Sequence, residues 1–132
     1  MNKKKKILIV DDLKEFAGLI RVFLSREFDI VTAYNGSEAL QKLEEGCRPD
    51  AIVTDLIMPG LDGYRLINFL KEDSRYRSIP VIVLTSVEKS IAETSLNTGR
   101  VSGFISKHFI SKDLFKELVP LLRNVTYYAY AS

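Results

Sequence analysis

Five polar side chains of chemically useful types each stand at the end of a short apolar run. They are Asp11 and Asp12 after residues 7–10, Asp55 after 51–54, Thr85 at the end of 80–85, and Lys107 after 103–106. Burying an unpaired carboxylate is costly, so three acids in such places need a cation or a metal ion beside them. The residue types therefore indicate one small site that handles an anionic group.

The chemistry that fits this set is phosphoryl transfer with Mg²⁺, a cation that prefers oxygen ligands and keeps several waters. We expect Asp12 and Asp55 to be direct ligands, Asp11 to hold a metal-bound water, and a backbone carbonyl just after Asp55 to complete the protein's share. Lys107 adds positive charge, and Thr85 adds a hydroxyl donor. Asp55 is carried alone on a central strand, and we predict that it is the nucleophile that becomes an aspartyl phosphate.

The elements that must position these groups alternate five times between strand and helix. Strands are expected at 7–10, 30–33, 51–54, 80–85 and 103–106. Helices are expected at about 13–26, from the Asn35 cap to Gly46, through 64–70, at 87–96, and at 112–123 after a Ser111 cap. In the first helix the apolar positions are Phe16, Leu19, Ile20, Phe23 and Leu24.

The strands show none of the polar and apolar alternation of a half-exposed antiparallel sheet. That pattern predicts a parallel sheet with helices on both faces, an α/β fold joined by right-handed crossovers. Ligands bind such sheets at the carboxyl ends of the strands, which is where the five polar side chains stand.

The composition narrows the function classes. The chain has 132 residues, 46% of them hydrophobic and 27% charged, which is typical of one ordinary globular domain. A net charge of +2 gives no support for nucleic-acid binding, and we expect none. The single cysteine, Cys47, and the lack of a long apolar segment lead us to expect a cytoplasmic setting without membrane insertion.

The motifs occur in a fixed order, each after its own strand. They are Asp11-Asp12, Asp55 followed by Met58-Pro59 and Asp62-Gly63, Thr85, and Phe104 through Lys107. With these motifs the chain resembles the receiver domain of two-component response regulators over nearly its whole length. It is similar to a stand-alone receiver of the chemotaxis-regulator kind, and the sequence does not separate that form from the receiver part of a longer regulator.

The resemblance implies a fold and a division of the chain. The implied fold is flavodoxin-like, a doubly wound (βα)5 arrangement with a parallel five-stranded sheet of order 2-1-3-4-5. We expect the receiver domain to occupy residues 1–124 and a short tyrosine-rich tail to occupy 125–132. The tail could extend the last helix, pack on the body or belong to a partner surface.

The resemblance also implies a signalling role. A sensor histidine kinase or a phosphotransfer protein would supply a phosphoryl group to Asp55 with Mg²⁺, and the chain would catalyse only its own phosphorylation and dephosphorylation. The Ile57 carbonyl would be a metal ligand, Thr85 and Lys107 would contact phosphoryl oxygens, and Ser86 is small enough to admit them. Thr85 and Phe104 would form a switch that remodels the fourth helix, fifth strand and fifth helix for an unidentified protein target.

Two departures from the pattern of the family bear on the site. Lys107 is followed by His108 instead of proline, and a cis bond before a non-proline residue costs about 2.5–4 kcal/mol, so the bond is either trans with a redirected loop or strained. Ile57 and Val87, two residues after Asp55 and Thr85, are apolar where other receivers often carry polar groups. We expect slow loss of the phosphoryl group.

Two other readings stay open. A degenerate receiver would bind partners constitutively without taking phosphate, and His108 keeps that reading in view. A Mg²⁺-dependent phosphatase would use Asp55 as its nucleophile, but enzymes resembling haloacid dehalogenases carry an Asp-x-Asp after the first strand, whereas Asp11 and Asp12 are adjacent. Capping of the first helix would explain one of the two adjacent acids, Asp11 and Asp12, and not both. Asp62, which precedes a glycine, is interpreted as a turn residue.

Overall fold

The protein is described from a computed structural model, which covers residues 3–96, 98–107 and 112–128. Within these ranges the strands form one parallel sheet of order β2-β1-β3-β4-β5, as predicted. The strands are β1 (Lys5–Val10), β2 (Phe28–Ala33), β3 (Ala51–Thr54), β4 (Val81–Thr85) and β5 (Gly103–Ser106). The helices are α1 (Lys14–Leu24), α2 (Gly36–Glu44), α3 (Gly63–Glu72), α4 (Lys89–Ser95) and α5 (Lys112–Arg123), with a 3₁₀ turn η1 (Thr98–Arg100) and a π-helical turn η2 (Asn124–Tyr128).

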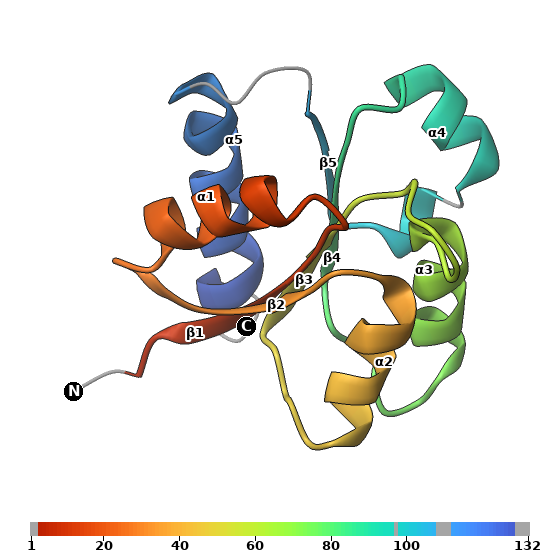
Figure 1. Ribbon diagram of the computed structural model, residues 1–132, viewed down its shortest axis with the longest axis horizontal. Coiled ribbons are helices and arrows are strands. Elements are labelled where there is room, and N and C mark those ends of the chain that lie inside the picture. The colour runs from red at the N-terminus through yellow and green to blue at the C-terminus, as the bar shows by residue number, and fades with distance from the viewer. Residues whose placement is uncertain (1–2, 97, 108–111, 129–132) are drawn as a thin grey trace.

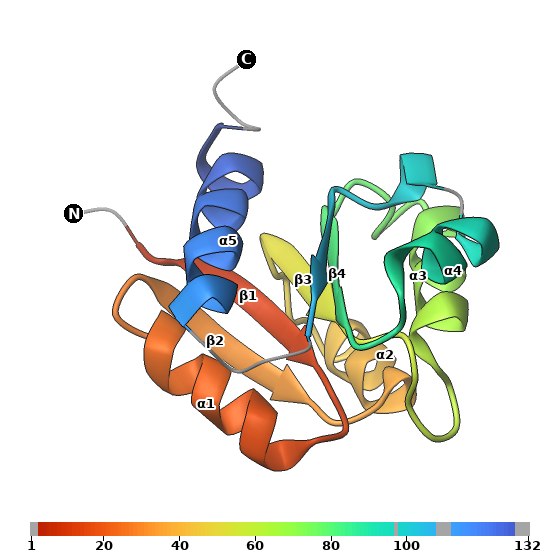
Figure 2. The same cartoon turned by 90° about the horizontal axis from the view of Figure 1, so that it is seen from above.

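Helices cover both faces of the sheet. Helices α1 and α5 lie on one face and α2, α3 and α4 on the other (Figures 1 and 2). Strand β1 serves both layers because successive side chains of a strand point to opposite faces. Leu8 and Val10 pack with the α2–α4 layer, and Ile7 and Ile9 with the α1–α5 layer.

Side-chain caps fix where two of the helices begin. The Asn35 side chain accepts a hydrogen bond from the Glu38 N–H at the start of α2, and the Asp62 side chain accepts one from the Arg65 N–H at the start of α3. Each cap satisfies an N–H that has no partner within the helix. Asp62 therefore lies in the turn before α3, as the sequence indicated, and it also caps the first residues of that helix.

Several boundaries differ from the predicted ones. Strands β1 and β2 each begin two residues earlier than predicted, because Lys5 and Lys6 pair with Phe28 and Asp29 in the parallel register. The polar side chains of Lys5, Lys6 and Asp29 hid this part of the ladder from a search for apolar runs. Helix α4 is shorter than the predicted 87–96 and begins at Lys89.

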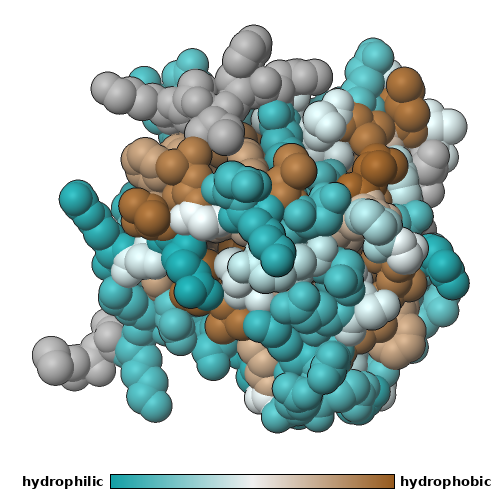
Figure 3. Space-filling view, in the orientation of Figure 1, coloured by the Kyte–Doolittle hydropathy of each residue, from teal (hydrophilic) through white to brown (hydrophobic). Residues whose placement is uncertain are grey.

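One of the apolar positions of the first helix, Phe23, does not lie on the buried face of α1. The buried face of α1 consists of Phe16, Ala17, Ile20 and Leu24, and Phe23 is 56% exposed. Its ring stacks on Phe115 of α5, with centroids 4.4 Å apart. Figure 3 shows hydrophobic residues on the surface where α1 and α5 lie.

The segment after α5 packs on the body of the domain as far as the structure describes it. Thr126 is fully buried and its hydroxyl donates to the Leu122 carbonyl, and the Tyr127 ring lies 6.2 Å from the ring of Phe28. Residues 129–132 of the expected tail lie outside the described residues. The division at residue 124 stays a prediction.

No helix in the described ranges combines the length and the apolar character needed to cross a membrane.

Candidate functional site

The register of the sheet brings the predicted site residues to one edge. Val10 of β1 pairs with Thr54 of β3, so Asp11 and Asp55 each follow directly after paired positions. Further along the same sheet, Thr85 of β4 pairs with Ser106 of β5, and Lys107 directly follows Ser106. Because all the strands are parallel, their carboxyl ends meet at the same edge.

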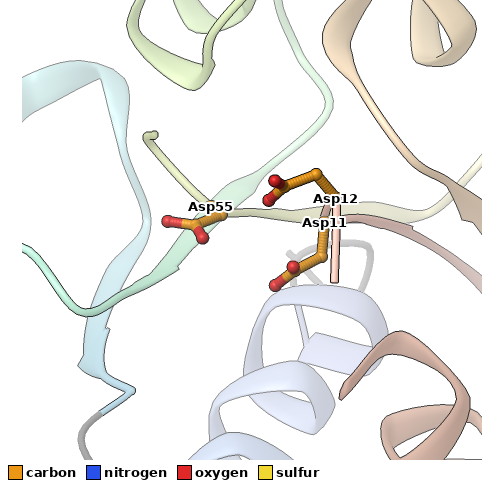
Figure 4. Close-up of side chains that lie close together, drawn as sticks. All are labelled: Asp11, Asp12 and Asp55. Carbon is orange, nitrogen blue, oxygen red and sulfur yellow. The ribbon is translucent and has the colours of Figure 1, made fainter. Parts of the chain in front are cut away.

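Three carboxylates gather at this edge. Ligand oxygens of Asp11, Asp12 and Asp55 all lie within 4.8 Å of one another, and their side chains lie together at the ends of β1 and β3 (Figure 4). Asp11 is 2% exposed and Asp55 6% exposed, while Asp12 is half-buried. Asp11 also accepts a hydrogen bond from the Leu13 N–H at 2.9 Å, so its Oδ1 helps to shape the chain just before α1 while its Oδ2 faces the site.

Lys107 joins two of the acids. Its Nζ lies 2.6 Å from Oδ2 of Asp11 and 3.0 Å from Oδ2 of Asp55. Desolvation alone would lower the pKa of Lys107, but the hydrogen bonds to both carboxylates outweigh it and raise that pKa. Desolvation raises the pKa of Asp11 against the opposing effect of Lys107. The lysine thus stays an ammonium ion in a pocket from which water is largely excluded.

The other oxygen of Asp55 is held by neutral donors. Oδ1 accepts hydrogen bonds from the Thr85 hydroxyl and from the Leu56 N–H, both at 2.6 Å. The Thr85 hydroxyl in turn accepts from the Val87 N–H at 3.3 Å. These bonds fix the orientation of the carboxylate and satisfy Thr85, which is fully buried.

A glycine lets the start of α3 lie close to the backbone of Asp55. A Cβ added at Gly63 would lie 2.0 Å from the Asp55 carbonyl oxygen and 2.7 Å from Leu56 Cα, so only glycine fits at this start of α3. The Gly63 N–H donates to the Leu56 carbonyl at 2.9 Å. Leu56 is fully buried and anchors the loop, whereas the Ile57 side chain is 60% exposed.

The remaining predicted residues take different positions. Ser86 is exposed next to the site, and Phe104 is half-buried and packs on the α2–α4 layer. His108 and the predicted Ser111 cap lie outside the described residues, as does the peptide bond that follows Lys107.

One contact of the site was missed by the sequence analysis. Lys107 Nζ lies over the ring of Phe16 in α1, 4.4 Å from its centroid. The sequence places Phe16 only among the apolar positions of the first helix, and no local motif links it to Lys107, so far away in the chain.

Comparison with known proteins identifies the family. A family model described as the response regulator receiver domain matches residues 7–119. The chain belongs to this family. It is a receiver domain of two-component signalling, and Asp11, Asp12 and Asp55 form its acidic pocket.

Individual relatives agree with this assignment. Chemotaxis protein CheY1 of Helicobacter pylori is 35% identical over 89% of this chain and 96% of that protein. Hybrid signal transduction histidine kinase D of Dictyostelium discoideum is 31% identical over 92% of this chain, which spans only 8% of the kinase. Response regulator TrrA of Thermotoga maritima, solved in complex with Mg²⁺-BeF, has a TM-score of 0.72 and 28% identity over 89% of this chain and 98% of that one.

Proposed function

We propose that Asp55 accepts a phosphoryl group from the phosphohistidine of a sensor histidine kinase or a phosphotransfer protein. The observation that carries this proposal is the environment of Asp55. The carboxylate is buried at the carboxyl end of β3, Lys107 and Thr85 each contact one of its oxygens, and two further carboxylates lie within 4.8 Å. Such a site can receive a group that brings negative charge and acceptor oxygens.

The residues present fit Mg²⁺. Three carboxylates against one ammonium leave an excess of negative charge, and carboxylate oxygens are the donors that Mg²⁺ prefers. Asp12 and Asp55 would hold the ion directly, Asp11 through water, and the Ile57 carbonyl would add a backbone ligand. When bound, the ion would supply positive charge next to the phosphoryl oxygens. The complex of TrrA with Mg²⁺-BeF supports the same assignment here.

In the proposed transfer a carboxylate oxygen of Asp55 attacks phosphorus. A new O–P bond forms, the P–N bond to the donor imidazole breaks, and the electron pair leaves with the imidazole. Lys107 neutralises charge on the incoming oxygens, Thr85 donates a hydrogen bond to one of them, and the small side chain of Ser86 leaves room. We propose that the chain has no external substrate to turn over and acts only on its own phosphorylation state.

Signalling would follow from rearrangement of Thr85. Its hydroxyl donates to Asp55 in the structure, and phosphorylation would offer it a phosphoryl oxygen as a new acceptor. Phe104 pairs in register with Val83, two residues before Thr85, and is half-buried. Movement of Thr85 would let Phe104 turn inward and change the surface of α4, β5 and α5 that a target protein reads.

Intact mass after incubation with acetyl phosphate and Mg²⁺ tests the proposal. We expect a gain of roughly 80 Da, one phosphoryl group, in the parent and none in Asp55→Asn. Asp62→Asn is the matched control, because asparagine caps α3 as well as aspartate does, and it should be modified like the parent. No gain in the parent would favour the degenerate receiver, and turnover of an external phosphoester would favour the phosphatase.

A further inference from the structure

An aromatic ring contacts the buried ammonium of the site. Lys107 Nζ lies 4.4 Å from the centroid of the Phe16 ring, well inside the range for a cation–π interaction. The ring belongs to the first turn of α1, and Phe16 is only 4% exposed. The Lys107 side chain is 6% exposed, so water screens little of this contact.

Apolar packing alone does not fix the position of the Lys107 ammonium group. Four rotatable bonds link the ammonium to the backbone, and it is drawn toward two carboxylates at once, Asp11 at 2.6 Å and Asp55 at 3.0 Å. The negative face of an aromatic ring attracts a cation, and that attraction grows where water is excluded. An aliphatic side chain of similar size would fill the same space without attracting the charge.

We propose that Phe16 is a positioning residue for phosphoryl transfer, whose ring face holds the Lys107 ammonium at the place where the phosphoryl oxygens arrive. This inference rests on the proposed function and adds a residue to it. In this role Phe16 acts through Lys107, the charged group that its ring contacts. It also has a second, purely structural task, since it packs in the α1–α5 layer with Ile20 and Leu114.

The initial rate of modification by acetyl phosphate with Mg²⁺ separates the two tasks. Phe16→Leu keeps an apolar side chain and removes the ring, and we expect it to slow the reaction on the order of tenfold. Phe16→Met is a second variant with a flexible, adaptable side chain, and it should be slowed to a similar extent. Phe28→Leu is the matched control, because Phe28 is equally buried in the same layer but on β2, and its rate should stay within about twofold of the parent.

The deciding readout is the same substitution in a Lys107→Ala background. If the ring acts through the ammonium, Phe16→Leu changes the rate of that background by less than about twofold. An equal slowing in both backgrounds would overturn the inference, since loosened packing does not depend on Lys107. A parental rate for Phe16→Leu would overturn it too. Failure of the parent itself to be modified would instead count against the proposed function.

Discussion

The residues of the candidate site carry more negative than positive charge. Asp11, Asp12 and Asp55 bring three negative charges, and Lys107 brings a positive charge that contacts two of them, Asp11 and Asp55. Burial raises the pKa of Asp11, while the two carboxylates raise the pKa of Lys107 despite its burial. Asp12 is half-buried, whereas Asp11 and Asp55 are buried, so Asp12 is the acid most available to a cation from solvent.

Removal of Asp12 should therefore separate metal binding from folding. We expect Asp12→Ala to keep or slightly raise the melting temperature without metal, because repulsion is relieved. In the parent, Mg²⁺ at a hundred times its dissociation constant should raise the free energy of unfolding by about 2.7 kcal/mol, and the melting temperature with it. We expect Asp12→Ala to lose most of this stabilisation. Thermal unfolding with and without Mg²⁺ measures both. Asp29→Ala, at an exposed aspartate of β2, should respond to Mg²⁺ as the parent does, and an undiminished response of Asp12→Ala would refute the metal assignment.

The apolar residues Ile57 and Val87 predict a long-lived phosphoryl group. Ile57 is 60% exposed and Val87 is half-buried. Neither side chain has a polar atom that could orient an attacking water molecule. We expect a half-life of minutes or longer in the parent, and a several-fold shorter one in Ile57→Asn, which adds a polar group at the rim. Loss of the mass gain with time, after removal of the phosphodonor, measures it. A parental half-life of seconds would contradict the expectation.

At the scale of elements, the β3–α3 junction is the tightest contact of the site. The absence of a side chain at Gly63 lets α3 begin directly against the backbone of Asp55 and Leu56. A methyl group there would meet backbone atoms, which cannot rotate away as a flexible side chain can.

Two glycine substitutions test this contact as a pair. We expect Gly63→Ala to destabilise the fold by about 3 kcal/mol or more, because the backbone must shift to relieve the overlap. Gly18→Ala lies in α1, where an added Cβ meets nothing within 4 Å, and should stabilise by about 0.5–1 kcal/mol. Denaturant unfolding measures both. A neutral Gly63→Ala would show that the junction is not held as tightly as described.

Most elements follow from local sequence patterns, and the exceptions have physical causes. The fully buried runs at β1, β3 and β4 are apolar on both faces and are recognisable without a structure. The apolar spacing on α1 includes Phe23, but it cannot reveal that this ring lies off the buried face and stacks on the partly buried Phe115 of α5. The early start of β1 was missed because backbone pairing, not side-chain burial, orders Lys5 and Lys6.

At the scale of the whole molecule, an ion pair joins distant parts of the chain on the α1–α5 side. Two guanidinium nitrogens of Arg123, at the end of α5, donate to the two carboxylate oxygens of Glu27, in the turn before β2. The hydrogen bond from Arg123 lowers the pKa of Glu27 below its ordinary 4.5.

This pair should give stability that depends on pH. A carboxyl group with a lowered pKa in the fold stabilises the protein above its unfolded pKa, and the contribution is lost as pH falls through the folded value. We expect Glu27→Gln to cost about 0.5–1 kcal/mol at pH 7, because the pair is largely exposed, and progressively less below about pH 4.5. Denaturant unfolding across this range measures the difference. A cost that stays constant to low pH would exclude the ion pair as its source.

The candidate site could be predicted because the order of strands places its residues. Thr85 ends a strand, and Asp11, Asp55 and Lys107 each follow one directly, so a parallel sheet is enough to bring them together. The contact of Phe16 with Lys107 could not be predicted in this way, because it depends on how α1 packs against the sheet and on the path of one long side chain.

The most direct test of the central claim is to locate the phosphoryl group. After incubation with acetyl phosphate and Mg²⁺, borohydride reduces an aspartyl phosphate to homoserine, and fragmentation of the tryptic peptides then places the changed residue. We predict homoserine at Asp55, in the peptide spanning residues 43–65, and unchanged aspartates in the peptide 7–14, which carries Asp11 and Asp12. Homoserine in the peptide 7–14, or at Asp62 in place of Asp55, would contradict the account.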